Sequence, residues 1–249
     1  MRTKVIAGNW KMYKTPEQTA VFFRDFLPLV SNHNRDEIVI CPPFVDLHTA
    51  VEAARNSNVA VGAQNLHWEK EGAFTGEISA QMLTAIGVTH VIIGHSERRQ
   101  YFKESDDSVN CKLKMALDHG LVPIVCVGEV LEECEGGLTE EVISRQCLRA
   151  FSGIPPQKAS KLIVAYEPVW AIGTGKTATP QMASDAHSVI RHKTGQMFGK
   201  EFADELRILY GGSVKPDNAT ALMSEPQIDG ALVGGASLDP ASFAGIVNY

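Results

Sequence analysis

The sequence has no long hydrophobic run. Its longest apolar stretch, Leu121 to Val127, is far shorter than the roughly 20 residues that a membrane-spanning helix needs. The N-terminal segment MRTKVIAGNW has neither the extended apolar core nor the small-residue cleavage site of a secretory signal peptide. We therefore expect a cytoplasmic protein without a membrane partner.

Cysteine and positive charge are also scarce. The 5 cysteines are odd in number and include no C-x-x-C pair, so neither a disulfide framework nor a zinc site is indicated, and we expect free thiols. A net charge of −6 argues against a nucleic-acid partner, because proteins that bind the phosphate backbone usually carry a basic patch. Any anionic ligand must therefore be held by local groups.

What the chain does contain is a regular series of short apolar segments. With 249 residues, of which 44% are hydrophobic and 21% charged, it has the composition of a globular protein. Runs rich in Val, Ile and Ala, each ending in Gly, Asn, Pro or a polar residue, predict eight strands. They cover residues 5–10, 37–43, 59–65, 88–95, 121–129, 162–168, 207–213 and 230–237.

Helical patterns lie between these strands, for example at 16–30, 105–120 and 179–193. Alternation of nearly continuous apolar strands with helices predicts a parallel sheet that is covered on both faces. An open, doubly wound sheet also fits this pattern. Eight units in about 250 residues match the closed (β/α)₈ barrel in count and length, and no linker divides the chain, so we expect one domain over residues 1–249.

In such a barrel the chemistry belongs at the carboxyl ends of the strands. The first strand ends in GNWKMYK, where period-two alternation places Ala7, Asn9 and Lys11 on one face, towards the barrel interior. Lys11 is then either a solvated turn lysine or an electrostatic anchor for an anion.

The fourth strand ends in VIIGHSERR, with His95 directly before Ser96, an expected helix N-cap, and Glu97 in the first turn. A helix N-terminus disfavours a positive charge, so we expect a neutral imidazole at His95. The alternative is a hydrogen-bonded structural histidine, which is our interpretation of the other seven.

Two Gly-Gly pairs stand at the ends of the seventh and eighth strands, in YGGSV and LVGGASL, with Ser213 beside the first pair. Glycine allows backbone N–H groups to converge on an oxyanion, and barrels commonly bind phosphate at this position. Tight strand-to-helix turns also use glycine pairs, so each pair alone would be ambiguous.

The segment AYEPVWAIGTGKTATP places one carboxylate, Glu167, at the end of the sixth strand. Its GTGKT sequence is not a nucleotide-binding P-loop, because Trp170 occupies the position of the first required glycine. The segment after Glu167 is either a simple long connection or a lid that closes over a ligand and excludes water.

Taken together and in this order, GNWKM, GHSERR, CVGE, AYEPVWAIGTGK, YGGSV and ALVGGASL closely resemble the triosephosphate isomerase family along essentially the whole chain. The resemblance implies a single-domain TIM barrel that interconverts dihydroxyacetone phosphate and glyceraldehyde 3-phosphate through an enediolate. It also implies that neither a cofactor nor a metal takes part.

The resemblance further assigns roles to individual residues. Glu167 is the base that moves a proton between two carbons, and His95 is the neutral electrophile. Lys11 and Asn9 stabilise the developing negative charge, and Glu97 supports this network. The resemblance implies a phosphate site at Gly173, Ser213, Gly234 and Gly235. It implies a lid made of Pro168, Val169, Trp170, Ala171, Ile172, Gly173, Thr174, Gly175, Lys176, Thr177 and Ala178.

The segment 64–79, which follows the third strand, carries Trp68 and Phe74 in a loop that contains glycine. It either packs over the barrel of its own chain or forms a partner surface. The resemblance implies a homodimer whose interface includes Phe74, Thr75, Glu77 and Arg98.

Three other functions remain open from the residues alone. A Schiff-base aldolase would use Lys11 as its nucleophile. A metal-dependent epimerase would need a cluster of His and acidic ligands, of which only His95 is evident at a strand end. A phosphate-binding module without catalytic activity would have no use for Glu167 beside a lid.

Overall fold

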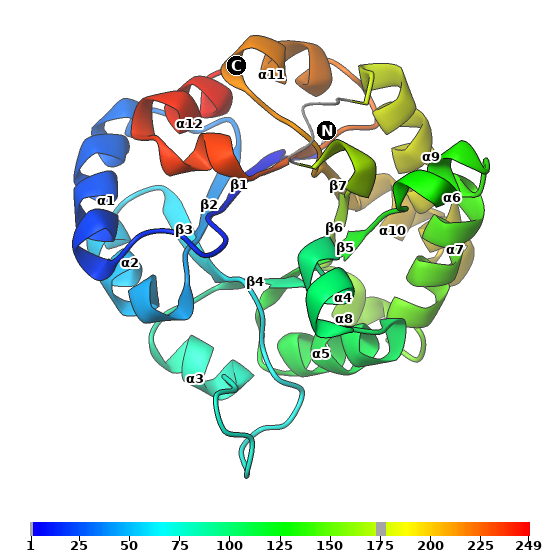
Figure 1. Ribbon diagram of the computed structural model, residues 1–249, viewed down its shortest axis with the longest axis horizontal. Helices are drawn as coiled ribbons and strands as arrows, with labels where there is room; N and C mark the ends of the chain where they lie inside the picture. The colour runs from blue at the N-terminus through cyan, green and yellow to red at the C-terminus, as the bar shows by residue number, and fades with distance from the viewer. Residues whose placement is uncertain (1, 173–177) are drawn as a thin grey trace.

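The computed structural model describes residues 2–172 and 178–249 and shows eight parallel strands inside a ring of helices (Figure 1). Each strand pairs with the next along the chain, and β1 also pairs with β8. The strands are β1 Val5–Asn9, β2 Glu37–Cys41, β3 Val59–Ala63, β4 His90–Ile93, β5 Val122–Val127, β6 Ile163–Tyr166, β7 Arg207–Tyr210 and β8 Gly230–Val233.

Pairing of the first strand with the last decides between the two architectures that the sequence allows. Val5 is opposite Gly230 and Gly8 is opposite Val233, so the sheet has no free edge and forms a closed barrel. An open doubly wound sheet is therefore excluded, and the predicted (β/α)₈ barrel is confirmed. The strands are shorter than the apolar runs, so several residues with candidate roles lie just beyond the strand ends.

Both faces of the strands are buried, which explains why the sequence shows continuous apolar runs instead of alternation. One set of side chains fills the barrel interior and includes Val5, Ala7, Ile92, Ile124 and Leu209. The alternate positions face the helices and belong to a second, larger hydrophobic cluster. Each strand thus contributes to two cores.

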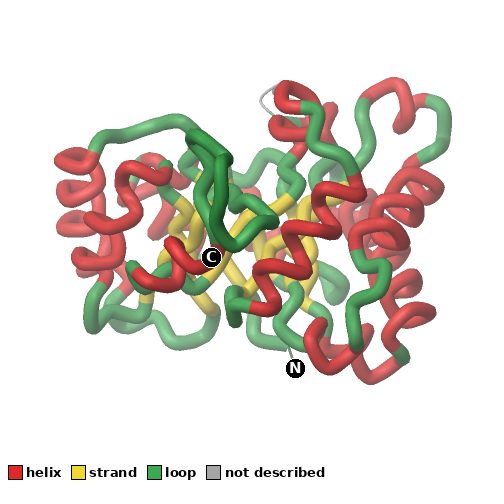
Figure 2. The backbone as a smooth tube through the Cα atoms, turned by 90° about the horizontal axis from the view of Figure 1, so that it is seen from below, coloured by secondary structure: helices red, strands yellow, loops and turns green. Residues whose placement is uncertain are grey.

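The helices surround the strands, as the side view in Figure 2 shows. None of the helices in the described part of the chain is long and apolar enough to cross a membrane. The α-helices are α1 Pro16–Val30, α2 Leu47–Ala54, α3 Ala80–Ala85, α4 Ser96–Phe102, α5 Asp106–Asp118, α6 Leu131–Glu135, α7 Thr139–Ala150, α8 Pro156–Ala159, α9 Pro180–Phe198, α10 Lys200–Glu205, α11 Pro216–Met223 and α12 Pro240–Val247. Three short 3₁₀ helices are η1 Phe44–Asp46, η2 Val169–Ala171 and η3 Gly235–Leu238.

Helix α1 shows how local signals fix an element. Thr15 and Gln18 form a capping box in which each side chain accepts a hydrogen bond from the other residue's backbone N–H, and Pro16 occupies the first helical turn. The buried face carries Phe22, Phe23 and other apolar residues at helical spacing. The predicted helix at 16–30 is confirmed, and these signals explain its start and the face that it buries.

The structure buries one histidine of the outer layer completely. His187 of α9 donates a hydrogen bond from Nδ1 to the backbone oxygen of Gln227 at 3.0 Å, and its ring packs edge-on against Tyr166 of β6. Burial lowers the pKa of His187 to about 4 from the ordinary 6.5, because a charged ring would lack hydration. The folded protein therefore holds this ring neutral at pH values where an unfolded chain would protonate it.

This difference predicts a loss of stability on acidification. Since the pKa is depressed to about 4 in the folded state, the contribution of His187 is intact above pH 6.5 and is lost as the pH falls towards 4. The free energy of unfolding should fall by about 2 kcal/mol more between pH 7 and pH 5 in the unmodified protein than in His187→Leu. Denaturant unfolding at the two pH values measures this.

His192→Leu is the matched control, because His192 lies exposed on the same helix. If both variants change the pH dependence of unfolding equally, the effect does not come from burial of His187.

Candidate active site

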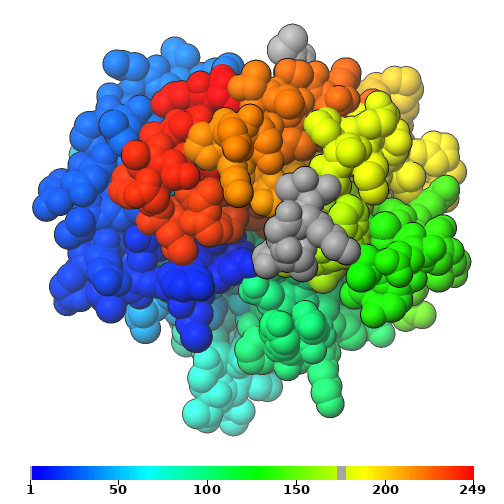
Figure 3. All heavy atoms as spheres, turned by 45° about the horizontal axis from the view of Figure 1, so that its top comes forward, coloured from blue at the N-terminus to red at the C-terminus, as the bar shows by residue number. Residues whose placement is uncertain are grey.

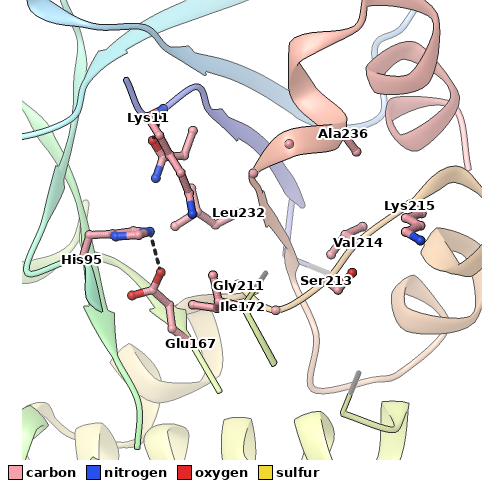
Figure 4. Close-up of a pocket in the computed structure, with 14 residues that line it drawn as sticks. Lys11, His95, Glu167, Ile172, Gly211, Ser213, Val214, Lys215, Leu232 and Ala236 are labelled. Atoms are coloured by element: carbon pink, nitrogen blue, oxygen red, sulfur yellow. Dashed lines mark hydrogen bonds and ion pairs between the residues drawn. The ribbon is translucent and has the colours of Figure 1, made fainter. Parts of the chain in front are cut away.

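A pocket opens at the carboxyl ends of the strands, where the sequence places the chemistry (Figure 4). Its volume is about 260 Å³, which is at the small end for ligand pockets. Five predicted site residues that carry charged or polar side chains meet there, namely Asn9, Lys11, His95, Glu167 and Ser213. The other lining residues are Ile172, Gly211, Gly212, Val214, Lys215, Leu232, Gly234, Gly235 and Ala236.

Glu167 is the first residue after β6, and its side chain is buried against the barrel mouth, with 2% of the residue exposed. One carboxylate oxygen, Oε2, accepts a hydrogen bond from the backbone N–H of Ser96 at 2.8 Å. Two glycines make room for it. A Cβ at Gly128 would lie 1.7 Å from the Glu167 carbonyl oxygen, and one at Gly211 would lie 2.9 Å from its Cγ.

His95 lies between β4 and α4 and faces the same carboxylate. Its Nε2 lies 2.8 Å from Oε1 of Glu167, and its Nδ1 accepts a hydrogen bond from the backbone N–H of Glu97 at 3.2 Å. The imidazole is therefore the N-cap of α4, and the expectation that Ser96 would cap this helix is wrong. The reason is that Nδ1 supplies the acceptor that a serine hydroxyl usually provides.

The two buried groups change each other's protonation. Burial opposes ionisation of the Glu167 carboxyl, but the attraction of His95 and the hydrogen bonds from His95 and Ser96 outweigh it, so its pKa is lowered. Burial also opposes the charged form of His95, yet the Glu167 carboxylate outweighs this, and the pKa of His95 is raised. Glu167 is thus held as a carboxylate.

This direction differs from the neutral His95 that the helix N-terminus alone predicts. The structure contains opposing effects on this ring. The adjacent carboxylate favours the charged form, whereas the backbone N–H at Nδ1 favours the neutral form, because an imidazolium could not accept that hydrogen bond. The protonation of His95 therefore depends on what lies between it and Glu167.

Lys11 reaches the pocket by an unusual backbone conformation. Strand β1 ends at Asn9, and Lys11 has a φ of 54°, in the left-handed region that non-glycine residues rarely adopt. Lys11 therefore does not continue the strand alternation of Ala7 and Asn9, although it lines the same pocket as Asn9. Asn9 accepts a hydrogen bond from the Lys11 N–H at 3.0 Å, and the Lys11 ammonium lies 2.6 Å from Oε1 of Glu97.

Sequence reasoning missed a residue that supports this conformation. The amide of Gln64, just after β3, donates hydrogen bonds to the carbonyl oxygens of Lys11 and Cys41, at 2.8 and 2.9 Å. The ends of β1, β2 and β3 are thereby joined. The available signal was the position of Gln64 at the end of a predicted strand, but no motif identified its partners.

The glycine pairs form the opposite wall of the pocket. Ser213, Gly234 and Gly235 all line it, as predicted, and a Cβ added at Gly235 would meet no atom within 4 Å. Gly235 also begins η3, and the first N–H groups of a helix have no partner within it. Lys215 lines the same wall and was not predicted, although its position two residues after Ser213 was a usable signal.

The segment that the sequence assigns to a lid is described up to Ile172 and again from Ala178. Val169–Ala171 form η2, and the indole Nε1 of Trp170 donates a hydrogen bond to Oε1 of Glu129 at 2.8 Å. Ile172 lines the pocket, and Ala178 is buried. Gly173, Thr174, Gly175, Lys176 and Thr177 lie outside the described residues.

The residues assigned to a subunit interface lie away from the pocket lining. The segment 64–79 projects beyond the barrel below α3 in Figure 1, and Figure 3 shows the same cyan segment standing out from the surface. Phe74, Thr75 and Glu77 are exposed on it. Arg98 is half-buried and pairs within the chain, with its Nε 3.0 Å from Oε1 of Glu104.

The assembled groups suit one kind of chemistry. A buried carboxylate can take a proton from carbon, while an imidazole N–H and a lysine ammonium on the same cavity stabilise the negative charge that develops on oxygen. Among the described residues, no group of three or more His, Cys, Asp or Glu side chains is placed to hold a metal ion.

Comparison with known proteins gives one consistent result. Residues 4–249 match the family model described as triosephosphate isomerase. A protein of that name from Solibacter usitatus (strain Ellin6076) is 61% identical over 249 residues, covering 100% of both chains. Proteins of the same name from Caldanaerobacter subterraneus subsp. tengcongensis and Carboxydothermus hydrogenoformans are 53% and 54% identical, covering at least 98% of each chain.

The contact between His95 and Glu167 generates a test that needs no substrate. Replacing Glu167 by Gln removes the charge that opposes the effect of burial on the ring, so the pKa of His95 should fall. Titration of the His95 ring nitrogens by ¹⁵N NMR in both proteins measures the change.

Glu97→Gln is the control, because Glu97 raises the pKa of His95 less than Glu167 does. A His95 pKa that is equal in the unmodified protein and in Glu167→Gln would contradict the coupling.

Proposed function

Because the chain belongs to the triosephosphate isomerase family, we propose how its own residues carry out the reaction of that family. The reaction interconverts dihydroxyacetone phosphate and D-glyceraldehyde 3-phosphate through an enediolate, a step of glycolysis and gluconeogenesis. The observation that supports the assignment best is the buried Glu167 carboxylate 2.8 Å from His95, on a cavity that also contains Lys11. We propose that residues 1–249 form one catalytic domain that uses neither cofactor nor metal.

Glu167 is the base in this proposal. It removes a proton from the carbon next to the carbonyl group and returns it to the neighbouring carbon. Its lowered pKa keeps the carboxylate ionised at neutral pH, and its burial keeps water from competing for the proton. Gly128 allows close approach of the Glu167 backbone, and Gly211 allows close approach of its side chain.

His95 is the electrophile. The substrate carbonyl oxygen takes the hydrogen bond of Nε2, which in the structure faces Oε1 of Glu167. Separation of the two side chains weakens the attraction that raises the pKa of His95, while the Glu97 N–H still donates to Nδ1. The ring is then neutral, and it can pass a proton between the two oxygens of the enediolate.

Lys11 and Asn9 supply the remaining charge stabilisation. The ammonium of Lys11 points into the pocket, beside the side chains of His95 and Glu167 (Figure 4). It interacts with the negative oxygen of the enediolate, and Glu97, at 2.6 Å, orients the ammonium. Preorganised groups of this kind are commonly worth a few kcal/mol in the transition state.

The substrate phosphate binds at the glycine wall. Backbone N–H groups of Ser213, Gly234 and Gly235 can approach its oxygens, because this side of the pocket carries little side-chain bulk. Residues 168–178, which include Gly173, close over the phosphate. They keep water from the enediolate and so prevent it from expelling its phosphate group.

The chain assembles as a homodimer in the cytoplasm. Exposed apolar side chains gather on the connections that follow β1, β2 and β3, and they include Met12, Tyr13, Val45 and Phe74, of which Met12 is 92% exposed. A monomer rarely leaves so many large apolar groups in water. Thr75 and Glu77 lie beside Phe74 on the projecting loop, and Arg98 completes the proposed interface.

Loss of the base tests the catalytic assignment. Glu167→Gln preserves the shape of the side chain, so turnover should fall by roughly 10² to 10⁴ or more while phosphate-containing inhibitors still bind. Isomerisation of glyceraldehyde 3-phosphate by EDTA-treated protein, followed with a coupled dehydrogenase, measures this. Near-normal turnover in Glu167→Gln would remove Glu167 from the mechanism.

The dimer predicts a sensitivity to charge on the projecting loop. Phe74→Asp should shift the mass measured by light scattering towards one chain, because it buries a carboxylate in an apolar interface. Leu148→Asp is the control, since Leu148 is similarly exposed, at 52%, but lies on α7. A fully active single chain at all concentrations of the unmodified protein would refute the homodimer.

A further inference from the structure

The guanidinium of Arg99 joins three parts of the chain behind the pocket. Arg99 lies on α4 and turns back towards the strands that precede and follow this helix. Its Nε donates to the carbonyl oxygen of Gly94 at 2.8 Å, and its Nη2 donates to that of Cys126 at 3.2 Å. Its Nη1 lies 2.6 Å from Oδ1 of Asp106, at the start of α5.

Both carbonyl groups adjoin the catalytic pair. The Gly94 carbonyl belongs to the peptide that leads into His95. The Cys126 carbonyl belongs to the peptide that leads into Val127, whose own carbonyl accepts the backbone N–H of Glu167 at 2.7 Å. A short chain of hydrogen bonds therefore runs from the backbone of His95, through Arg99, to the backbone of Glu167.

Arg99 extends the pairing of two strands beyond the end of their ladder. The ladder between β4 and β5 ends at Ile93 and Val125. Arg99 then donates to the carbonyl oxygen of the next residue along each strand, Gly94 after β4 and Cys126 near the end of β5. A second, open pocket of about 810 Å³ is lined by Gly94, Arg99, Cys126 and Glu167, so water can reach this side of the strand ends and the Arg99 hydrogen bonds add to the packing there.

The local sequence favours this role for Arg99. Gly94 has a φ of 73°, and a Cβ at this position would lie 3.1 Å from the Arg99 Nη2, so glycine permits the close approach of the guanidinium. Asp106 orients the guanidinium and balances its charge. A lysine ammonium could not reach the two carbonyls and the carboxylate together, because it lacks the planar fork of donors.

We propose that Arg99 is a positioning residue that sets the distance between His95 and Glu167. Arg99 does not line the substrate pocket or its glycine wall, which follows β7 and β8. This inference rests on the proposed roles of His95 and Glu167. Loss of Arg99 should consequently lower kcat and leave substrate affinity nearly unchanged.

The chain contains a matched control in Arg191. Its guanidinium also donates to two backbone carbonyls, of Ala203 and Leu206, and pairs with a carboxylate, Asp229, at 2.7 Å. The same substitutions at Arg191 remove a comparable set of bonds but lie among α9, α10 and the segment before β8, away from the pocket lining. The kcat and melting temperature of these variants show the effect of losing an arginine that has only a structural role.

The experiment compares Arg99→Lys and Arg99→Met with Arg191→Lys and Arg191→Met in the isomerisation assay. We expect kcat to fall about tenfold in Arg99→Lys and roughly 10²-fold in Arg99→Met, with KM within about threefold, because small displacements of catalytic groups are costly. The Arg191 variants should lower the melting temperature and keep kcat within about twofold.

A double-mutant cycle separates positioning from general damage. If Arg99 acts through Glu167, Arg99→Lys should cost less than about twofold once Glu167 is already Gln. Asp106→Asn, which leaves Arg99 in place but removes the carboxylate that orients it, should lower kcat about threefold. If the Arg99 variants do not fold, the kcat of Asp106→Asn tests the proposal by itself.

Two results would overturn the proposal. One is a kcat within about twofold of normal in both Arg99→Lys and Asp106→Asn. The other is an equal loss of kcat in the Arg99 and Arg191 variants. In either case a large loss of turnover in Glu167→Gln would leave the proposed function standing, whereas normal turnover in Glu167→Gln would refute the role of Glu167 independently of Arg99.

Discussion

The contact between the Glu167 carboxylate and the His95 imidazole is the interaction on which the rest of the site depends. A carboxylate with 2% exposure is costly to bury, and it remains ionised because His95, the Ser96 N–H and Lys11 compensate for the lost water. His95 and Ser96 follow β4, Lys11 follows β1, and Glu167 itself follows β6. The closed barrel is what makes their meeting possible, since it brings all eight carboxyl ends to one rim.

The contact between His95 and Glu167 also controls the protonation of both groups. In the structure, Glu167 raises the pKa of His95 and His95 lowers that of Glu167, so each group is held by the other. In the proposed mechanism a substrate oxygen enters between them and replaces this contact. The same step would leave a carboxylate facing carbon and an imidazole N–H facing oxygen, which is the polarity that proton transfer next to a carbonyl requires.

Local signals account for the predictions that were confirmed. The helix at 16–30 begins where predicted because Thr15, Gln18 and Pro16 specify its start. The prediction that Ser96 caps α4 was wrong, because an imidazole nitrogen can accept the same hydrogen bond and His95 precedes it. Lys11 lines the same pocket as Asn9, as expected, but not by continued strand alternation: β1 ends at Asn9, and the backbone of Lys11 turns into the left-handed region.

The sequence by itself determined the eight strand and helix units, the helix ends with strong caps, and the residue types at the strand ends, because these depend on periodicity and short-range chemistry. Tertiary structure alone decided that β1 pairs with β8 and that Glu167 meets His95 at 2.8 Å. It also decided that Gln64 and Arg99 donate to backbone carbonyls at the ends of four strands, β1, β2, β4 and β5. Such contacts join residues far apart along the chain, and no periodicity or local propensity encodes which distant carbonyl a side-chain donor will reach.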